Sequence, residues 1–287
     1  MSDRLPISVL LLARDETGRL ETLIPSLDFA REVVVVWDAD GDPAARGVAE
    51  RLGARVFERR FDGFGPQRQF ALLQCAQPWV LWIDADERPD AALVASLREF
   101  METAAGRAPG GREAVVDGVR DELACSSIRF VRRTWFLGTR IRFCGWRDER
   151  ILRAFRRESA HFDDAPVHER VHVAGRTADL RGTLEHRSYE TLEDCVVKMK
   201  RYARAGAEKA WRGGARANAF DVLVRPPLRF LRQYVLQLGV LDGAHGVALC
   251  GFAAAQVFLK YAALWDRSRR ERARPSGGPA AGRATRA

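Results

Sequence analysis

The sequence predicts an α/β fold, in which a doubly wound, mostly parallel sheet is followed by a β-rich region and C-terminal helices. Apolar runs without polar alternation recur through the first part of the chain, as expected for strands buried on both faces. Segments with helical periodicity separate these runs, an alternation typical of parallel strands joined by helices. The 287 residues are 47% hydrophobic, which is enough for the core of one large domain with an appendage.

The predicted elements of this sheet follow one another in a regular order. The first strand is ISVLLLA at 7–13, and a helical pattern follows it. The second strand is EVVVVWD at 32–38, which leads into the helical pattern PAARGVAERLG. ARVFER is the third strand, GFGPQRQFALLQCA the next helix and WVLWIDAD the fourth strand. A further helix is predicted in PDAALVASLREFM, with Pro89 near its first turn.

Composition divides the chain into consecutive predicted parts. Residues 1–103 form the α/β half, and 104–126, rich in glycine, proline and charge, form a loop or insertion. Residues 127–190 are strand-like and rich in arginine. Helical periodicity returns over 191–266, and 267–287 are predicted to be a disordered basic tail.

The charge balance predicts a polyanionic partner. The net charge is +9, which suits phosphate, nucleic acid or an anionic membrane surface. No pattern of a nucleic-acid-binding fold is found and the arginines are spread over many elements, so nucleic acid is not expected. Five cysteines without a C-x-x-C pair indicate neither a disulfide framework nor a thiolate zinc site, which favours a reducing compartment. The N-terminal apolar run is too short for a signal peptide.

Acidic residues stand at the ends of three predicted strands. They are Asp15 and Glu16, Asp38 and Asp40, and Asp84 and Asp86. The carboxyl ends of parallel strands form the ligand site of an open sheet, so all six are candidates for a substrate or metal site. Oxygen ligands favour a hard cation, Mg²⁺ or Mn²⁺, which also binds substrate phosphates. A solvated turn is the alternative, and Glu87, Arg153 and Arg156 are equally compatible with ordinary solvated charge.

The segment HERVH at 168–172 matches the zinc-metalloprotease motif H-E-x-x-H. That chemistry needs a helix, which brings two histidines four residues apart onto one face. The surrounding APVHERVHVAG has alternating valines between a proline and a glycine, which indicates a strand instead. His168 and His172 would then lie about 13 Å apart, too far to bind one ion. A zinc protease is therefore the least favoured interpretation.

Several segments, taken in their order along the chain, carry a family resemblance. They are ISVLLLARDE, VVVVWDADGD, FDGFGPQRQFAL, WVLWIDADE, FLGTRIRFCGW, ILRAFRR, VHERV and HRSYETLEDCVVKMKRYA, over about residues 5–265. Together they resemble the family 2 glycosyltransferases, particularly the bacterial branch that builds lipopolysaccharide cores. The resemblance implies a GT-A fold, a nucleotide-sugar donor (a UDP-sugar in our prediction), an Mg²⁺ or Mn²⁺ ion, and inversion at the anomeric carbon.

The resemblance also implies roles for single residues. Asp38 would contact the nucleotide base, and Asp84 and Asp86 would surround the metal and the diphosphate. Gln67 and Arg68, in GFGPQRQ, are candidates for substrate binding, with Arg68 at the diphosphate. The chain departs from the usual family pattern in two places, where it has RDE for KNE and DADGDP for DSGSTD.

Glycosyl transfer with inversion needs a carboxylate base on the side opposite the leaving group. In GWRDERILRAFRR we predict Asp148 as this base and Glu149 as the second choice, with ion pairs to Arg147 or Arg150 as the alternative. His168 in VHERV is a further substrate-site candidate, for which a structural hydrogen bond is the alternative. Three aromatic residues are compatible with acceptor stacking or with core packing: Trp135, Phe136 and Trp146.

The C-terminal apolar stretch predicts a membrane partner. VALCGFAAAQVFLKYAALW at 247–265 could nearly span a bilayer, but Gln256 and Lys260 favour a helix that lies on the surface or inserts shallowly. Neighbouring arginines would face anionic headgroups: Arg225, Arg229, Arg232, Arg267, Arg269 and Arg270. The alternative is a helix packed on the catalytic domain.

The sequence therefore predicts a metal-dependent, inverting glycosyltransferase, cytoplasmic and peripheral at the inner face of the cytoplasmic membrane. In this prediction 1–103 bind the nucleotide sugar, 127–190 carry the base on the acceptor side, and 191–266 associate with the membrane. The expected acceptor is a lipid-linked or lipopolysaccharide-core saccharide. A non-catalytic sugar-nucleotide or nucleic-acid binding module is the alternative.

Overall fold

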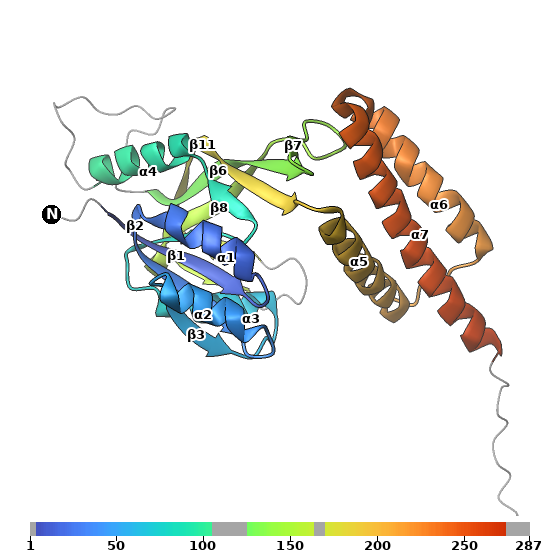
Figure 1. Ribbon diagram of the computed structural model, residues 1–287, viewed down its shortest axis with the longest axis horizontal. Coiled ribbons are helices and arrows are strands. Elements are labelled where there is room, and N and C mark those ends of the chain that lie inside the picture. Colours follow the sequence, from blue (N-terminus) through green and yellow to red (C-terminus); the bar gives the residue numbers. More distant parts are fainter. Residues whose placement is uncertain (1–3, 105–124, 164–169, 274–287) are drawn as a thin grey trace, which may run out of the picture. The chain divides into compact units, whose positions relative to one another are not determined.

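The structure, a computed structural model, describes residues 4–104, 125–163 and 170–273 (Figure 1). The chain divides into two compact units. Unit 1 comprises Met1–Arg140 and Asp148–Ser188, and unit 2 comprises Ile141–Arg147 and Tyr189–Ala287. The short segment 141–147 therefore belongs to unit 2, although the chain on both sides of it belongs to unit 1.

Unit 1 is built on one sheet with the strand order β3-β2-β1-β4-β8-β6-β11-β5. Parallel pairing joins the first four strands: β3 (Arg55–Arg59), β2 (Ala30–Asp38), β1 (Leu5–Ala13) and β4 (Trp79–Trp82). The sheet continues with β8 (Glu149–Arg156), β6 (Cys125–Phe136), β11 (Arg176–Tyr189) and β5 (Glu87–Pro89), and β7 (Thr139–Arg140) pairs with β6. β8 is antiparallel to both β4 and β6, and β5 is antiparallel to β11.

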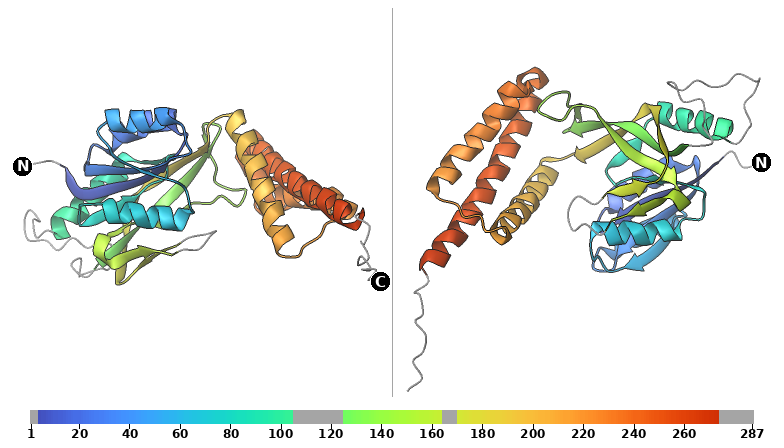
Figure 2. Two further views of the ribbon diagram at one scale, coloured as in Figure 1. Left: turned by 90° about the horizontal axis from the view of Figure 1, so that it is seen from below. Right: turned by 180° about the vertical axis from the view of Figure 1, so that it is seen from behind.

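Both faces of the parallel strands are covered, because successive residues of a strand point to opposite sides. Val9 and Leu11 of β1 pack in one core with residues of α1, α2 and α4, whereas Leu10 packs in a second core with residues of α3 (Figure 2). These helices are α1 (Thr17–Leu23, continued by η1, Ile24–Leu27), α2 (Pro43–Arg51), α3 (Phe64–Gln74) and α4 (Ala91–Ala104). Burial on both faces explains the uninterrupted apolar runs, and the predicted α/β class is confirmed.

The chain turns sharply after β4, and this turn contains the acidic motif. β4 ends at Trp82, so Asp84 and Asp86 lie between β4 and β5. β5 pairs with β11, with Glu87 opposite His186. The acidic motif is thereby held between a buried central strand and a second strand pairing.

A small two-stranded sheet lies between β8 and β11 in the chain. It consists of β9 (Ala160–Phe162) and β10 (Val171–Val173), and the short helix η3 (Arg157–Ser159) precedes it. His172 lies on β10, and its Nε2 is 3.1 Å from Asp163 Oδ2. A strand at His172 contradicts the helix that a zinc protease would need. His168 and Glu169 lie outside the described residues.

Unit 2 is helical. Its elements are α5 (Leu192–Arg212), α6 (Ala219–Leu231), the π-helical η4 (Arg232–Leu236), the short η5 (Gly239–Asp242) and α7 (Gly243–Ala273). α7 packs against both α5 and α6 (Figure 2). Within the described residues, the stretch Gly239–Arg272 contains a segment that is long and apolar enough to cross a membrane by length and composition alone. Core helices of soluble proteins can meet the same criterion.

Candidate active site

The acidic strand ends predicted to share one edge of the sheet do follow neighbouring strands. β2, β1 and β4 are adjacent and parallel. The acids follow or end these strands: Asp38 and Asp40 at β2, Asp15 and Glu16 at β1, and Asp84 and Asp86 at β4. The structure thus brings all three pairs to the carboxyl edge of the sheet, where ligands of open α/β sheets bind.

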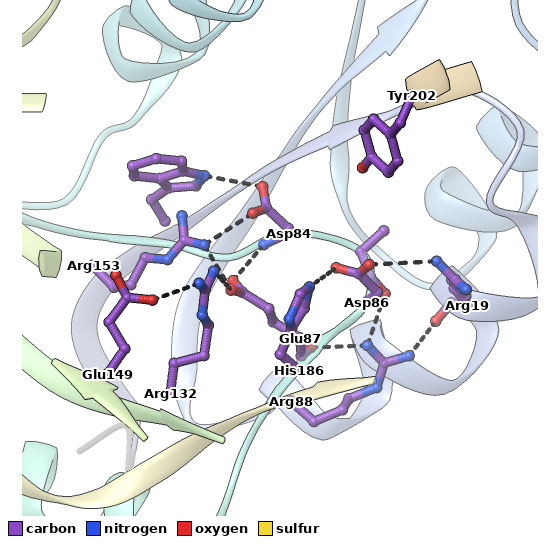
Figure 3. A network of polar contacts seen from close by, with 12 residues as sticks. Arg19, Asp84, Asp86, Glu87, Arg88, Arg132, Glu149, Arg153, His186 and Tyr202 are labelled. Atoms are coloured by element: carbon purple, nitrogen blue, oxygen red, sulfur yellow. Dashed lines mark hydrogen bonds and ion pairs between the residues drawn. The ribbon is translucent and has the colours of Figure 1, made fainter. Parts of the chain in front are cut away.

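A buried ion-pair network surrounds the end of β4 (Figure 3). Arg153, only 4% exposed, donates to Asp84 Oδ2 at 2.9 Å and to Glu87 Oε1 at 2.6 Å. Arg68 donates to Asp84 Oδ1 at 3.1 Å. Both guanidiniums stack on the ring of Trp82, at 4.0 and 4.1 Å from its centre, and the indole N–H donates to Asp84 at 3.3 Å. Asp84 is therefore held by two cations and one neutral donor.

The alternative that Glu87 and Arg153 are ordinary solvated charges is wrong. Glu87 is 0% exposed, and its Oε2 accepts the backbone N–H of Asp84 at 3.0 Å. A charge in such a position must be paired, because burial removes its hydration. Arg156, in contrast, is half-buried and donates to the carbonyl of Cys125 at 3.1 Å.

A local irregularity of β8 brings Arg153 into this network. Ala154 pairs with Ile128 of β6, but the next pair joins Leu152 to Arg129, so Arg153 has no partner residue in the β6 register. An extra residue of this kind redirects its side chain, and such bulges are common beside active sites.

Burial and neighbouring charges shift the pKa values of this network. Burial raises the pKa of Glu87 and outweighs Arg153, which acts to lower it. Burial also acts to raise the pKa of Asp84, but Arg153 and Arg68 outweigh it and the pKa is lowered. For Arg153, burial acts to lower the pKa, yet Glu87 and Asp84 outweigh it and the pKa is raised. Asp84 and Arg153 thus remain charged in the folded protein.

Asp86 has different partners from Asp84. Its Oδ1 is 3.5 Å from His186 Nε2 of β11, and its Oδ2 is 3.7 Å from Arg19 Nη1 of α1 (Figure 3). These distances are longer than those at Asp84, where the guanidinium contacts are 2.9 and 3.1 Å. His186 did not figure among the candidates predicted from sequence.

The family resemblance implies a divalent cation, and the side chains at the end of β4 differ in how well they could bind it. Both oxygens of Asp84 already accept N–H groups, which is a poor setting for a metal ligand. Asp86 and His186 offer an oxygen and a nitrogen donor, a pair that suits Mn²⁺ better than Mg²⁺, which prefers oxygen ligands, when water and phosphate oxygens complete the coordination. Within residues 4–104, 125–163 and 170–273, no group of three or more His, Cys, Asp or Glu is arranged to hold an ion. The protein donors therefore fit a cation that substrate helps to bind.

The residues after β2 form a second polar group at the same edge. Asp38 is buried, and its Oδ1 accepts the backbone N–H groups of Asp40 and Phe61, both at 3.2 Å. Arg14 Nη1 lies 3.3 Å from Asp38 Oδ2. Asp40 itself pairs with Arg60 at 2.9 Å. Asp38 therefore organises the backbone after β2 in addition to any contact with a nucleotide.

Three further substrate-site candidates bind mainly to the backbone. Asp15 Oδ1 accepts the N–H of Asp42 at 2.9 Å, and Glu16 Oε2 accepts the N–H of Asp15 at 3.0 Å. Gln67 is buried and donates to the carbonyl of Arg59 at 3.1 Å. Its Oε1 is buried without a hydrogen-bond partner among the described residues, so it is a candidate acceptor for a ligand donor.

Asp148, the first choice for the base, is held by two arginines. Its Oδ2 lies 2.8 Å from Arg140 Nη2 and 3.3 Å from Arg133 Nε. An ion pair was the structural alternative for this residue, and it forms, but with these partners rather than with Arg147 or Arg150.

Glu149 is the first residue of β8 and is linked to the buried network. Its Oε2 is 2.8 Å from Arg132 Nη2, and Arg132 Nη1 is 3.9 Å from Glu87 Oε1 (Figure 3). Through this arginine, Glu149 is joined to the residues that surround Asp84.

The aromatic candidates have separate surroundings. Phe136 is buried, which favours core packing. Trp135 is half-buried, with the Arg187 guanidinium 5.8 Å from its ring centre. Trp146 belongs to unit 2 and stacks on Tyr189, with ring centroids 5.7 Å apart.

Comparison with known proteins identifies the class of enzyme. No family model matches the sequence. The chain is nevertheless homologous to glycosyltransferases along nearly its whole length, and it is an enzyme of that class. The lipopolysaccharide core biosynthesis glycosyltransferase LpsC of Rhizobium meliloti is 29% identical over 270 residues, which are 92% of each chain. An uncharacterised glycosyltransferase of Rickettsia prowazekii is 23% identical over 278 residues, 91% of this chain and 87% of that protein.

Solved structures of glycosyltransferases are more distant. TarS of S. aureus, in complex with UDP-GlcNAc, is 15% identical and matches with a TM-score of 0.42 over 92% of both chains. Glucosyl-3-phosphoglycerate synthase of Mycobacterium tuberculosis, with Mn²⁺, UDP and glucosyl-3-phosphoglycerate, is 18% identical with a TM-score of 0.32, over 54% of this chain and 57% of that chain.

Proposed function

We propose that this glycosyltransferase moves a sugar from a nucleotide-sugar, in the first instance a UDP-sugar, to a lipopolysaccharide-core or lipid-linked saccharide, with inversion at the anomeric carbon. The observation that carries the proposal is the carboxyl edge of β2, β1 and β4, where acidic strand ends meet buried arginines. Homology to LpsC over 92% of both chains supports the acceptor class.

Arg68 is the proposed diphosphate contact. Its guanidinium is held by Asp84 and stacks on Trp82, so little side-chain freedom is lost when an anion binds. Arginine binds phosphate oxygens through several N–H groups at once, which suits a leaving diphosphate. Asp38, at the end of β2, is the proposed contact of the nucleotide base, as the family resemblance implies.

For the cation we propose Asp86 and His186 as the protein donors. Asp84, predicted from sequence as a metal ligand, is proposed instead to orient Arg68 and Arg153, because both of its oxygens accept their N–H groups. A bound Mg²⁺ or Mn²⁺ would supply Lewis-acid stabilisation of the departing diphosphate.

For the base that deprotonates the acceptor hydroxyl we propose Glu149, with Asp148 as the alternative. The contact of Arg132 with both Glu149 and Glu87 supports this order, since it joins Glu149 to the network at the end of β4. The sequence alone favoured Asp148, whose carboxylate is shared by two other arginines.

We also propose that the enzyme works as a peripheral protein at the cytoplasmic face of the inner membrane. The apolar segment within Gly239–Arg272 and the surplus of arginine support this location, because a lipid-linked acceptor is presented at a membrane surface.

Isothermal titration of UDP into the purified protein, with and without Mn²⁺, tests the donor site. We expect Mn²⁺ to strengthen UDP binding at least about tenfold, the effect of 1.4 kcal/mol, and Asp86→Ala to abolish this gain. Glu50→Ala, at an exposed carboxylate of α2, is the matched control and should bind as wild type. Failure of both UDP and GDP to bind, with and without metal, would overturn the proposal. Binding without transfer to any saccharide would favour a non-catalytic binding module.

A further inference from the structure

The outer side of α6 exposes large apolar side chains to solvent. Phe220, Leu223, Leu228 and Leu231 are 69%, 71%, 58% and 52% exposed. Exposure continues beyond α6 at the large apolar residues of η4, η5 and the turn between them: Val235, Leu236, Leu238, Val240 and Leu241. An exposed apolar surface of this extent marks an interaction site rather than scattered single residues.

Three of these side chains of α6 share one side of the helix with Pro227, and Leu228 lies to one side of them. Phe220, Leu223, Pro227 and Leu231 recur every three or four residues and so form one stripe along α6. The buried residue Pro226 lies off this stripe, and α6 packs against α7. The packing of unit 2 therefore uses another side of α6 and leaves the apolar stripe uncovered.

A row of arginines lies about 100° or more around the helix from the apolar stripe, with Leu228 between the two. Arg225, Arg229 and Arg232 are spaced by four and three residues, which puts them on a common side of the helix. Residues 219–242, which span α6, η4 and η5, contain these three arginines and two acids, Asp221 and Asp242, so their net charge is 3 − 2 = +1. Asp221 pairs with Arg225 at 2.6 Å. The exposed surface of this segment thus combines an apolar stripe with a small net positive charge.

We propose that α6, continued by η4 and η5, is a membrane-docking surface that lies in the headgroup region of an anionic bilayer. The apolar stripe would enter the lipid, and Arg229 and Arg232 would meet the lipid phosphates. Arg225 pairs with Asp221 and lies 4.6 Å from the ring centre of Tyr261 on α7. Lipid is favoured over a second copy of the chain as the occupant, because anionic headgroups complement Arg229 and Arg232. The inference rests on the membrane-side location in the proposed function and deepens it, because it assigns the contact to α6. On α7 the large apolar side chains exposed to a similar degree, within its described residues, are Val247 and Phe258.

Vesicle sedimentation with the full-length protein tests this surface. Vesicles of phosphatidylcholine alone are compared with vesicles that also contain phosphatidylglycerol, at low and at high salt. We expect the anionic vesicles to bind at least about tenfold more tightly and the difference to shrink with salt. Leu223→Ser with Leu231→Ser should weaken binding about tenfold or more, because two partly inserted leucines are lost. Arg229→Gln with Arg232→Gln should weaken it to a similar degree and flatten the salt dependence.

Leu73→Ser is the matched control, since Leu73 is a 68% exposed leucine of α3 in unit 1, and its vesicle binding should equal that of wild type. Circular dichroism and UDP titration of each variant show that the fold and the donor site are intact. Wild type without preference for anionic vesicles, or a leucine double variant that binds as wild type, would overturn the inference. A dimer that this double variant converts to monomers, with vesicle binding unchanged, would assign the stripe to a second copy and overturn it too. Loss of UDP binding with vesicle binding retained would instead count against the donor site alone.

Discussion

Arg153 is a buried cation between two carboxylates, and its removal would leave both without their main counterion. Glu87 is fully buried, so water does not compensate its charge in the folded protein. We expect Arg153→Met, which keeps much of the aliphatic volume, to lower the free energy of unfolding by about 3–5 kcal/mol, as is typical when one partner of a buried ion pair is removed. Urea denaturation followed by circular dichroism measures the change.

Arg46→Met provides the comparison at the protein surface. Arg46 also contacts two carboxylates, Glu50 at 2.9 Å and Glu58 at 2.6 Å, but all three side chains are exposed. Exposed pairs contribute little because water screens them, so its denaturation midpoint should stay close to that of wild type. Equal midpoints for Arg46→Met and Arg153→Met would contradict a stabilising role of the buried network.

Glu149 and Asp148 are neighbours in the chain but differ in their contacts, and this difference can be tested by turnover. Glu149→Gln removes the proposed base with little change in size, so we expect kcat to fall by about 10²–10⁴-fold while UDP affinity is retained. Asp148→Asn should change kcat by less than about tenfold, because in our proposal it accepts no proton. Initial rates of UDP release with a lipopolysaccharide-core saccharide measure both. The reverse pattern would make Asp148 the base.

The carboxylates of the site could be predicted from the sequence more fully than their partners. Asp84 and Asp86 follow an unmistakable apolar strand, so element order alone locates them. Arg153 stands among other arginines in ILRAFRR, and nothing local distinguishes a buried arginine from a solvated one. His186 reaches Asp86 because β11 pairs with β5, with Glu87 opposite His186. A pairing between such distant segments has no signal in a single sequence.

Among the elements, Asp90 connects the start of α4 to β11. Its Oδ1 accepts the N–H of Leu93 at 2.7 Å, which caps the first turn of α4, and the N–H of Thr183 at 3.0 Å. Its Oδ2 accepts the Thr183 hydroxyl at 2.5 Å. Burial acts to raise the pKa of Asp90, but these hydrogen bonds outweigh it, and the pKa is lowered. The charged carboxylate therefore stabilises the fold above its unfolded pKa of about 3.9.

Asp90→Ala should lower the free energy of unfolding at neutral pH by about 1–2 kcal/mol, the usual cost of losing a helix N-cap. The contribution of the Asp90 charge to the free energy of unfolding is lost as the pH falls through the lowered pKa that Asp90 has in the folded protein. The gap between wild type and variant should therefore narrow below about pH 4. Urea denaturation of both proteins at a series of pH values measures this gap. A gap that stays constant down to acid pH would mean that the carboxylate charge has no part in it.

Periodicity located most helices and strands of unit 1, but it did not locate where elements end. Pro89 is the last residue of β5, and α4 begins at Ala91, two residues after the start of the predicted helical pattern at Pro89. α7 continues to Ala273, past residue 266, where a disordered tail was expected. Arginine and glutamate are good helix formers, so the composition of this stretch does not end a helix. Two ion pairs also join the end of α7 to neighbouring residues: Arg216 with Glu271 at 2.6 Å and Arg267 with Glu208 at 2.5 Å.

At the scale of the whole molecule, the segment 141–147 belongs to unit 2, whereas its neighbours on both sides in the sequence belong to unit 1. Asp242 accepts the backbone N–H groups of Arg142 and Phe143 at 3.0 and 2.9 Å, and Gln233 donates to the carbonyl of Cys144 at 3.0 Å. Composition can divide a chain only into consecutive ranges, so it could not show that 141–147 belongs to unit 2. The contacts join residues about a hundred positions apart in the chain.

Both units contain cysteines, so the unfolding of each unit can be followed separately by cysteine labelling. All five are free and buried: Cys75 and Cys125 in unit 1, and Cys144, Cys195 and Cys250 in unit 2. Burial raises the pKa of Cys75 to about 12 and also raises the pKa values of Cys144 and Cys250. Buried, protonated thiols react slowly, so labelling of each cysteine requires its surroundings to open.

We therefore expect short pulses of a thiol reagent in increasing urea to label the cysteines in two groups, because each compact unit should unfold cooperatively. Cys144 discriminates between the alternatives, since its sequence neighbours belong to unit 1 while its sulfur lies 3.8 Å from that of Cys250. Mass spectrometry of the labelled peptides should show Cys144 reacting together with Cys250 and Cys195. If Cys144 reacts together with Cys75 and Cys125 instead, the segment 141–147 unfolds with unit 1. One common midpoint for all five would mean that the two units unfold together.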